Sequence, residues 1–430
     1  MYYKLYNLAF TLLTPFLYIY ILIRVLKGKE DFKRLGERFG RASVKRKEGK
    51  LIWLHAASLG EAITLLILVD KLKHTFPKTN FLFTSGTINS AKVLKERLDP
   101  KIIHQFVPID KKSFVRRFLK YWKPDFVIFV ESEIWPNLIV ESKKAGAELV
   151  LVNAKLSDKS YIKAYKHKSF YHFLLSHFSI ILAQSLDAKE KLESLSNQQI
   201  AIIKNLKFDA VPLQANPIEV GNYLNLLRNR KVFLAVSTHK GEEKIILETH
   251  KRLKLDFHNL LTIICPRHPI RTPEIEREIE KLELKYQVRT KSKSIDDDTD
   301  VYLANTVGEL GLFFRLSEIC FVGGSLVEGI GGHNPIEPAK LNLAIISGKF
   351  VENFQEIYKD MLQRKAVKIV ENQNELIKTI HNLFTDKVTL RNMISASFAF
   401  SQDKSGSSKE ILQKIVPLIQ KKLGVDNIPL

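Results

Sequence analysis

The stretch ICFVGGSLVEGIGGHNPIEP, residues 319–338, points most directly to the fold of this chain. It opens with four apolar residues typical of a buried strand, continues through two glycine pairs and reaches Pro335, which suits the first turn of a helix. Glycines let the backbone approach a ligand closely, and a helix N-terminus offers free N–H groups to an anion such as phosphate. The alternative is a tight structural turn without a ligand. We predict an anion site at Asn334, Pro335, Ile336 and Glu337, with Glu337 accepting hydrogen bonds from ribose hydroxyls.

Short apolar runs alternate with amphipathic segments on both sides of this stretch. Such alternation is typical of βαβ units in a parallel sheet covered on both faces. It lapses at residues 210–217, where two prolines indicate a linker. Because 430 residues are too many for one core, we expect an α/β protein of two Rossmann-like domains, residues 30–212 and 218–430, with a ligand cleft between them. The predicted strands are 51–54, 81–84, 102–107, 126–130, 148–152 and 179–183, then 232–236, 260–265, 301–303, 319–322 and 343–346.

The N-terminus has a different pattern. Residues 5–23 carry no charge and are interrupted only by Pro15, and about 20 apolar residues can span a bilayer. Basic residues follow, which places the bulk of the protein in the cytoplasm. We predict a membrane-anchor helix within residues 1–27; a helix lying in the interface is the alternative, and a cleaved signal peptide is disfavoured. The basic residues Arg34, Arg38, Arg41, Lys45, Arg46 and Lys47 either contact lipid phosphates or form a solvated segment.

Composition narrows the function classes. The net charge is +21, from 67 Lys and Arg against 46 Asp and Glu, so an anionic partner is expected. Basic-aromatic clusters typical of RNA-binding modules are missing, which disfavours a nucleic-acid-binding protein. The two cysteines, Cys265 and Cys320, lie in apolar runs and indicate neither disulfide nor metal site. Walker-type, His-Glu-x-x-His and Gly-x-Ser-x-Gly motifs are missing too.

Several polar residues follow predicted strands, where ligands of parallel sheets bind. Pro266 and Arg267 follow residues 260–265, and the arginine can hold phosphate or base unless it forms a surface salt bridge. Glu61 opens the helix after the first strand, either as a general base or as a partner of the helix dipole. His239, after residues 232–236, is expected to be structural rather than catalytic.

Two further charged residues are candidates. Glu131 and Glu133 follow residues 126–130, and one of them can offset positive charge on a sugar carbon. The alternative is that one carboxylate is buried and hydrogen-bonded and the other is solvated. Lys207, just before the linker, can neutralise a leaving phosphate, although by position alone a solvated lysine is the better interpretation.

At these residues the chain resembles a known family, the Kdo transferases of lipopolysaccharide synthesis, which attach 3-deoxy-D-manno-octulosonic acid (Kdo) to lipid A precursors. The matching segments run in the expected order as far as residue 357. They are RLGERFG, IWLHAASLGEA, FVPID, ESEIWPNLI, NAKLSDKS, NLKFD, STHKGEE, PRHP, VGEL, GGSLVEG, GGHNPIEPA and NFQEI.

The resemblance implies a GT-B fold, a CMP-Kdo donor, a lipid A precursor as acceptor, inversion at the anomeric carbon, and no metal or cofactor. It implies an inner-membrane protein on the cytoplasmic face. By resemblance Glu61 is the base, and Glu131 and Lys207 stabilise the transition state. The residues implied to hold CMP are Pro266, Arg267, Val307, Gly308, Glu309, Asn334, Pro335, Ile336 and Glu337.

The chain departs from the family pattern at Asn305-Thr306-Val307, at Lys204 and by one extra residue between Gly324 and Gly331. Two rival interpretations keep the fold: another nucleotide-sugar transferase, or a sugar-nucleotide epimerase. A membrane-tethered nucleic-acid-binding protein is a third.

Overall fold

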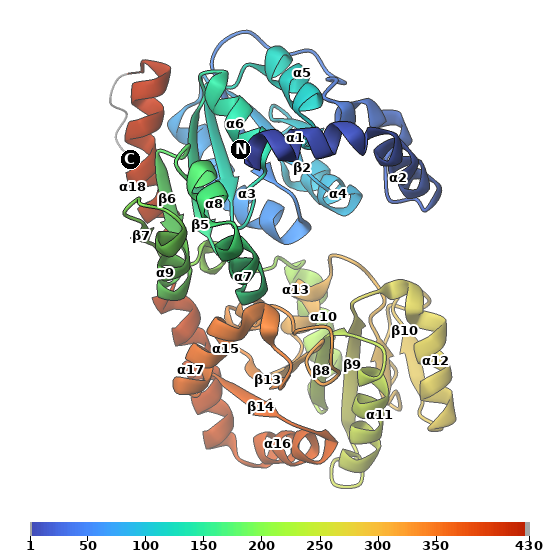
Figure 1. The fold of residues 1–430 in the computed structure, drawn as a ribbon. Helices are drawn as coiled ribbons and strands as arrows, with labels where there is room; N and C mark the ends of the chain where they lie inside the picture. Colours follow the sequence, from blue (N-terminus) through green and yellow to red (C-terminus); the bar gives the residue numbers. More distant parts are fainter. Residues whose placement is uncertain (1, 426–430) are drawn as a thin grey trace. The chain divides into compact units, whose positions relative to one another are not determined.

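A computed structural model describes residues 2–425 and divides the chain into two compact units. Unit 1 comprises Met1–Ala210 and Ser405–Leu430, and unit 2 comprises Val211–Lys404 (Figure 1). Each unit contains one seven-stranded sheet whose paired strands are all parallel. The expected pair of parallel α/β domains is therefore confirmed.

The sheet of unit 1 has the order β3-β2-β1-β4-β5-β6-β7. Its central strands are continuous apolar runs because both faces are covered. Side chains alternate along β1: Ile52 and Leu54 face α3, α4 and α18, whereas Leu51 and Trp53 face α5, α6, α8 and α9. The strands are β1 (Leu51–Ala56), β2 (Asn80–Ser85), β3 (Ile103–Phe106), β4 (Phe126–Val130), β5 (Glu148–Ala154), β6 (Ile180–Ala183) and β7 (Ala201–Ile202).

The helices of unit 1 connect these strands in the right order for parallel pairing, and several begin with a capping side chain. Ser58, Thr87, Ser157 and Ser185 each accept a hydrogen bond from an amide in the first turn of the following helix. The helices are α1 (Tyr2–Leu12), α2 (Thr14–Leu26), η1 (Phe32–Phe39), α3 (Leu59–Thr75), α4 (Ile88–Arg97), α5 (Lys112–Trp122), α6 (Pro136–Lys144), α7 (Asp158–Lys166), α8 (Lys168–Leu175), α9 (Leu186–Leu195), η2 (Leu206–Asp209) and α18 (Ser407–Leu423).

The sheet of unit 2 has the order β10-β11-β9-β8-β12-β13-β14. One face packs against α11, α12 and α16 through apolar side chains such as Ile246, Ile275 and Ile380. The strands are β8 (Lys231–Thr238), β9 (Leu260–Pro266), β10 (Tyr286–Val288), β11 (Val301–Leu303), β12 (Ile319–Val322), β13 (Ala344–Gly348) and β14 (Val367–Val370). The helices are α10 (Pro217–Leu226), α11 (Glu242–Leu253), η3 (Pro269–Arg271), α12 (Thr272–Lys281), α13 (Leu310–Phe314), α14 (Ile336–Ala339), η4 (Glu352–Phe354), α15 (Gln355–Gln363), α16 (Gln373–Thr385) and α17 (Lys387–Asp403).

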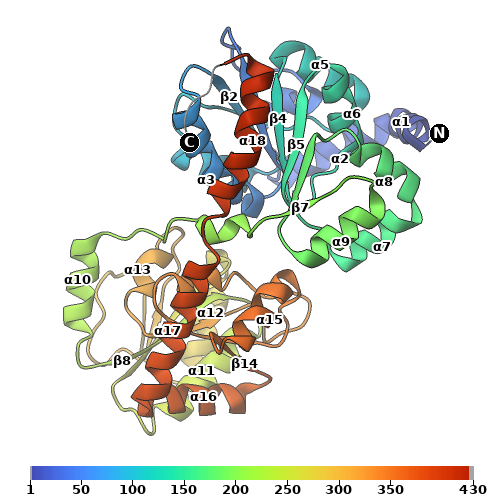
Figure 2. The ribbon, with the colours of Figure 1, turned by 90° about the vertical axis from the view of Figure 1, so that its left-hand side faces the viewer.

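The C-terminal helix corrects one predicted boundary. Residues 405–430 were expected to belong to the second domain, but α18 lies along unit 1 against α3 and β5 (Figure 2). Its apolar face buries Ile411, Ile415 and Ile419 in the core of unit 1. Asp209 fixes the start of α18 by accepting hydrogen bonds from the amides of Gly406 and Ser408, both at 2.6 Å. The compact second unit therefore ends at Lys404.

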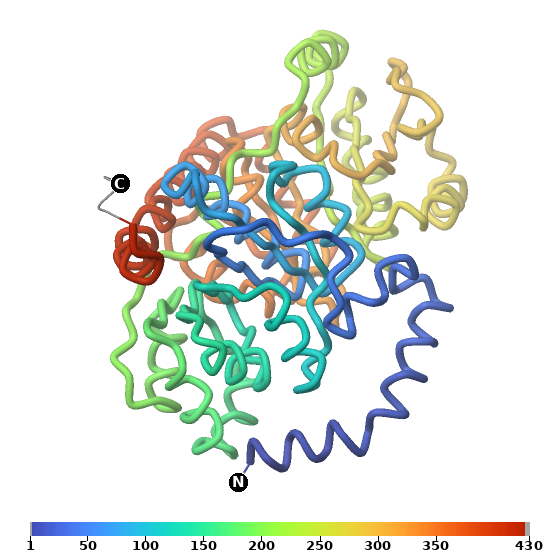
Figure 3. The backbone as a smooth tube through the Cα atoms, turned by 90° about the horizontal axis from the view of Figure 1, so that it is seen from above, coloured from blue at the N-terminus to red at the C-terminus, as the bar shows by residue number. Residues whose placement is uncertain are grey.

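The N-terminal segment also differs from the prediction. Instead of one continuous apolar helix, α1 and α2 meet at a bend of 62° (Figure 3). Pro15 has no N–H and its ring crowds the preceding turn, which explains the break. No single helix of the described residues is long and apolar enough to cross a membrane, whereas the bent pair passes that test by length and composition.

Candidate active site

In unit 1, the charged residues predicted for chemistry meet where β1, β4 and β5 end. Glu131 follows β4 with a positive φ of 55°, and Asn153 near the end of β5 has a φ of 51°. Non-glycine residues rarely adopt this conformation, and such strain is held only where the surroundings enforce it. Here the amide of Glu131 donates to the carbonyl of Val152 at 3.1 Å, which locks the turn to β5.

The carboxylate of Glu131 is 4% exposed and lies between two ammonium groups. Lys155 Nζ lies 2.6 Å from Oε2, and Lys207 Nζ lies 2.9 Å from Oε1. Burial by itself would raise the pKa of Glu131, but the two lysines outweigh it and lower the pKa. Glu131 is therefore ionised at neutral pH, and the three groups together carry one net positive charge.

Lys207 is not a solvated surface residue, contrary to the interpretation from its position alone. Its side chain is 19% exposed and points into the site from η2. Asn153 Oδ1 accepts a hydrogen bond from the amide of Leu206 at 2.9 Å, and Asn205 caps the same turn by accepting from the amide of Lys207. The strained Asn153 thus sets the position of Lys207.

Glu61 closes a capping box at the start of α3. Its Oε2 accepts hydrogen bonds from the amides of Ala57 and Ser58 at 2.8 and 3.1 Å, while its own amide donates to Ser58 Oγ. Its Oε1 has no hydrogen-bond partner among residues 2–425. Burial, then the charges of Glu133 and Glu131, raise the pKa of Glu61. Glu61 therefore caps the helix through one oxygen and presents the other, of raised basicity, to a ligand. The two predicted roles, partner of the helix dipole and general base, are compatible.

Glu133 lies close to Glu61 and Glu131 but has different hydrogen-bond partners. Its Oε2 lies 3.2 Å from Nε2 of the fully buried His55 and accepts a hydrogen bond from the Trp135 indole. His55 Nδ1 contacts Thr84 Oγ1 at 2.9 Å, which fixes the ring. Sequence reasoning missed His55, which lies between Leu54 and Ala56 inside β1, and Lys155, which directly follows β5.

In unit 2, the predicted nucleotide-binding residues lie at or beyond the carboxyl ends of β9, β11 and β12. Pro266 ends β9 and is buried; Arg267 follows it and is exposed, with its amide donating to the carbonyl of Thr238 at 3.0 Å. The Arg267 guanidinium makes no ion pair within the described part of the chain. The alternative of a surface salt bridge is therefore wrong, and the group is available to an anion.

The glycine-rich loop after β12 is held by an internal anion. The carboxylate of Glu242, fully buried at the start of α11, accepts hydrogen bonds from four amides: His239 at 2.9 Å, Gly324 at 2.7 Å, Ser325 at 2.9 Å and Leu326 at 3.0 Å. The amides of residues 324–326 are therefore occupied and do not receive a phosphate. For this first glycine pair the structural alternative is correct.

The second glycine pair leads into α14 as expected. Asn334 Oδ1 accepts a hydrogen bond from the amide of Ile336 at 3.0 Å, so Asn334 caps the turn, and Pro335 precedes the first helical residue. Glu337 lies in the first turn and is partly buried. Gly331 and Gly332 both have positive φ, and a Cβ on Gly331 would approach the Asn353 side chain to 2.8 Å.

Three histidines gather beside this turn and Arg267. His239 and His333 stack with ring planes at 12°, and their Nε2 atoms are 2.8 Å apart, so one donates and the other accepts. His268 packs edge-on against His239 with centroids 5.6 Å apart. Burial and nearby cations lower the pKa of His239 and bring the pKa of His333 to about 4. Both rings are therefore neutral at pH 7 and contribute hydrogen-bonding atoms rather than charge.

The turn at Val307, Gly308 and Glu309 is positioned by a buried arginine that sequence reasoning missed. Arg289, whose side chain is 1% exposed, donates hydrogen bonds to both carboxylate oxygens of Glu309 at 3.0 and 2.6 Å. It also pairs with Glu219 and Tyr223. The Glu309 carboxylate is thus engaged, while the Val307 side chain is 86% exposed. The turn can offer a ligand its backbone and this apolar side chain.

No group of three or more His, Cys, Asp and Glu side chains within residues 2–425 is arranged to hold a metal ion. Metal independence of the reaction stays a prediction. Cys265 and Cys320 are buried free thiols, as expected.

Comparison with known proteins points to one family. Residues 33–210 match the family model described as 3-deoxy-D-manno-octulosonic-acid transferase (kdotransferase). The chain is 36% identical over 414 residues to the 3-deoxy-D-manno-octulosonic acid transferase of Rickettsia bellii, covering 96% of this chain and 98% of that protein. It is 30% identical over 418 residues to the transferase of the same description from Haemophilus influenzae, covering 95% and 96%.

Solved structures share the fold. A glycosyltransferase from Rickettsia africae aligns with a TM-score of 0.59 at 14% identity, over 88% of this chain and 99% of that one. The UDP-GlcNAc 2-epimerase of Neisseria meningitidis aligns with a TM-score of 0.57 at 14% identity, over 86% and 100%. At this identity the likeness concerns the fold alone, so it does not choose between transferase and epimerase.

Proposed function

This chain belongs to the family of 3-deoxy-D-manno-octulosonic acid transferases, and on that premise we propose that it transfers Kdo from CMP-Kdo to a glucosamine hydroxyl of a lipid A precursor, with inversion at the anomeric carbon. Family membership establishes a Kdo-transferring glycosyltransferase. The donor, the acceptor and the stereochemistry are our proposal. The observation that carries it is the group of Glu61, Glu131 and two lysines where β1, β4 and β5 end.

Unit 2 would hold the donor. The unpaired guanidinium of Arg267 suits the phosphate of CMP, and the turn capped by Asn334 offers polar groups beside it. Neutral His239 and His333 add hydrogen-bonding atoms next to Arg267. We assign the nucleoside to the backbone of Val307 and Gly308 and to the side chain of Glu337.

Unit 1 would carry out the chemistry on the acceptor. Glu61 Oε1 takes the proton of the glucosamine hydroxyl, whose oxygen forms a bond to C2 of Kdo as the bond from C2 to the CMP oxygen breaks. The electron pair of that bond leaves with CMP, and attack from the opposite face inverts C2. A raised pKa makes Glu61 a better proton acceptor than an ordinary carboxylate once it is ionised.

Glu131 and its two lysines would stabilise charges that develop on the substrates in the transition state. The carboxylate offsets cation-like charge on the sugar ring, and Lys207 and Lys155 offset negative charge on the departing phosphate. Because both lysines are already held by Glu131, little reorganisation is needed during the reaction.

For the cellular location we propose the cytoplasmic face of the inner membrane, with α1 and α2 lying in the interface. Tyr3 donates to Asn137 and Glu141, and Tyr6 donates to Asp110 at 2.8 Å, so α1 is bound to unit 1 along its first turns. Large apolar side chains of the pair remain exposed, as a bilayer surface requires; they are Leu5, Leu8, Leu12, Leu13, Phe16, Ile19, Leu22, Ile23 and Leu26.

The basic segment 34–47, which follows α1 and α2, offers fewer side chains for lipid contact than its charge suggested. Arg38 is buried against Glu30, Arg34 pairs with Glu37, and Arg46 donates to backbone carbonyls. Of the six basic residues predicted to face lipid, Arg41, Lys45 and Lys47 stay exposed.

The test is incubation of the full chain with CMP-Kdo and a tetraacylated lipid A precursor, followed by mass spectrometry of the lipid. We expect a mass gain of one or more Kdo residues, and stabilisation of the protein by CMP but not by UDP. No lipid product together with stabilisation by UDP would favour another nucleotide-sugar enzyme. A salt-sensitive gel shift with RNA or DNA would support the nucleic-acid alternative.

A further inference from the structure

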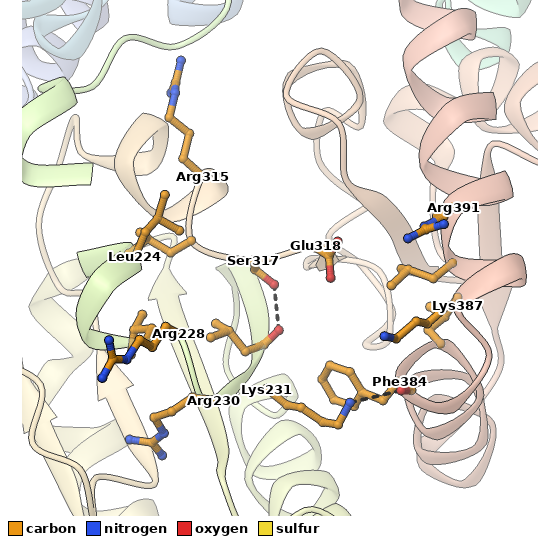
Figure 4. Close-up of a pocket in the computed structure, with 15 residues that line it drawn as sticks. Leu224, Arg228, Arg230, Lys231, Arg315, Ser317, Glu318, Phe384, Lys387 and Arg391 are labelled. Atoms are coloured by element: carbon orange, nitrogen blue, oxygen red, sulfur yellow. Dashed lines mark hydrogen bonds between the residues drawn. The ribbon is translucent and has the colours of Figure 1, made fainter. Parts of the chain in front are cut away.

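Unit 2 contains a second basic site at the amino ends of its central strands, whereas Arg267 lies at their carboxyl ends. A hollow of about 460 Å³ opens where β8 and β12 begin (Figure 4). Arg267 lies beyond the other end of these parallel strands, and β8 has eight residues, about 25 Å in length. The hollow is therefore separate from the residues proposed to hold the donor.

Cations dominate the walls of this hollow. Lys387 and Arg391 reach in from α17, Arg228 follows α10, and Lys231 and Arg315 complete the set (Figure 4). Glu318 is the single carboxylate among the lining residues, so cations outnumber anions there, although the guanidinium of Arg315 is turned away from the hollow toward the carbonyls of Leu213 and Gly311 (Figure 4). Arg230 also lines the hollow, but nearby aspartates, Asp300 first, partly offset its charge.

Internal hydrogen bonds do not cancel these charges. Lys231 donates to the carbonyl of Phe384 at 3.1 Å, and Arg315 donates to the carbonyls of Leu213 and Gly311. Carbonyls satisfy the N–H groups but bring no negative charge. Arg228, Lys387 and Arg391 make no ion pair or hydrogen bond within the described residues.

The placement of Lys387 and Arg391 is unfavourable without an anion. They lie four residues apart on one helix, where like charges repel, and Lys387 opens α17, where the helix dipole also disfavours a cation. Asp386 makes no ion pair with either cation within the described residues, and its carboxylate accepts hydrogen bonds from the amides of Val388 and Thr389.

We propose that this hollow binds a phosphate monoester. A doubly charged phosphate can accept hydrogen bonds from Arg391 and Lys387 together, and the guanidinium favours its bidentate geometry. Among the apolar lining residues, Leu224 is exposed and Phe384 is half-buried, so these two side chains give the organic part of the ester a surface to cover. Neither a nucleobase nor the lipid acceptor is needed for this binding, so the site does not depend on the proposed transfer reaction.

The experiment titrates phenyl phosphate into the full-length protein by calorimetry. The variant Arg228→Ala/Lys387→Ala/Arg391→Ala is expected to lose affinity by at least about tenfold. The control Lys359→Ala/Lys368→Ala/Lys378→Ala removes three exposed lysines of the same unit outside the hollow and should bind like wild type. Phenol, which has no phosphate, should not bind at the same concentration.

Two further experiments distinguish this hollow from the candidate donor site and identify the source of the phosphate ester. Arg267→Ala removes the candidate donor anion site, and the binding of phenyl phosphate that is lost in the triple variant should persist in Arg267→Ala. Competition by short-chain phosphatidate would identify a lipid headgroup as the source of the ester, and competition by a sugar phosphate alone would identify a soluble one. If the triple variant unfolds, Arg391→Gln alone should still weaken binding. Equal binding by the hollow variant and wild type, or equal loss in the lysine control, would overturn the proposal.

Discussion

Glu131 in unit 1 and Glu242 in unit 2 are both buried carboxylates just beyond a central strand, but different groups hold them. Glu131 lies between the ammonium groups of Lys155 and Lys207. Glu242 accepts four hydrogen bonds from backbone amides. Each lysine ammonium has three N–H donors and can contact a substrate while it stays on Glu131, whereas each backbone amide has one N–H, which Glu242 already occupies. The contrast supports the proposed chemical role of Glu131 and indicates a structural role for Glu242.

The largest effect is expected on stability at Glu242. In Glu242→Ala the four amides lose their acceptor, so the free energy of unfolding should fall by about 3–5 kcal/mol. Urea unfolding measures this change. The control Glu248→Ala, on the same helix but paired only with exposed Lys244, should cost well under about 1 kcal/mol. Equal losses in the two variants would show that Glu242 does not hold the loop.

Glu131→Gln should lower the transfer rate strongly and the stability only slightly, whereas Glu242→Ala should lower the stability. The amide keeps the shape but not the charge, so the transfer rate should fall about 10²–10³-fold, as when a transition-state electrostatic partner is removed. The unfolding midpoint should change much less than for Glu242→Ala. The measurement pairs the transfer rate with urea unfolding of the same preparation. Normal transfer by a stable Glu131→Gln protein would remove Glu131 from the mechanism.

Substitutions of Lys155 and Lys207, the two partners of Glu131, should also slow transfer. Lys207→Met or Lys155→Met removes one ammonium and lets burial raise the pKa of Glu131, so each single change should slow transfer about tenfold or more. Because both lysines contact the same carboxylate, the double variant should differ from the product of the two effects. A double-mutant cycle on the transfer rate provides the test. Strictly additive losses would mean that the lysines act independently.

The smallest expected effect concerns pH. Glu61 must be ionised to accept a proton, and its pKa is raised, so the transfer rate should fall with decreasing pH at a higher pH than an ordinary carboxylate would give. Glu133→Gln removes a negative neighbour and should shift this acid limb to lower pH by less than about one unit. The pH profile of kcat/KM in both proteins measures the shift. An acid limb that moves upward in Glu133→Gln would contradict the assignment.

Most of the fold could be predicted because buried parallel strands are continuous apolar runs. The strands that were missed, β7, β10 and β14, are short or alternate between buried and exposed residues, and so they lack that pattern. The apolar face of α18 shows that the helix is buried, but periodicity cannot tell which of two similar sheets it covers.

The positions of Glu61, Glu131 and Arg267 beyond the strand ends could be predicted, because polar residues there follow apolar runs, while their roles in the reaction stay a prediction. The roles of Glu242 and Arg289 could not be predicted, because their partners lie far away in the sequence: Gly324 is 82 residues from Glu242, and Glu219 is 70 residues from Arg289. Lys155 was overlooked although it stands two residues after Asn153, since nothing local distinguishes a lysine that turns inward from one that faces solvent.

Glu61→Gln tests the central claim most directly. Glutamine keeps an oxygen that can accept from the amides of Ala57 and Ser58, so the cap of α3 and the fold should survive, but it cannot take up the hydroxyl proton. Single-turnover transfer of Kdo from CMP-Kdo to the lipid acceptor should slow by about 10²–10⁴-fold, with CMP affinity unchanged. Transfer at the wild-type rate by this variant would contradict the account.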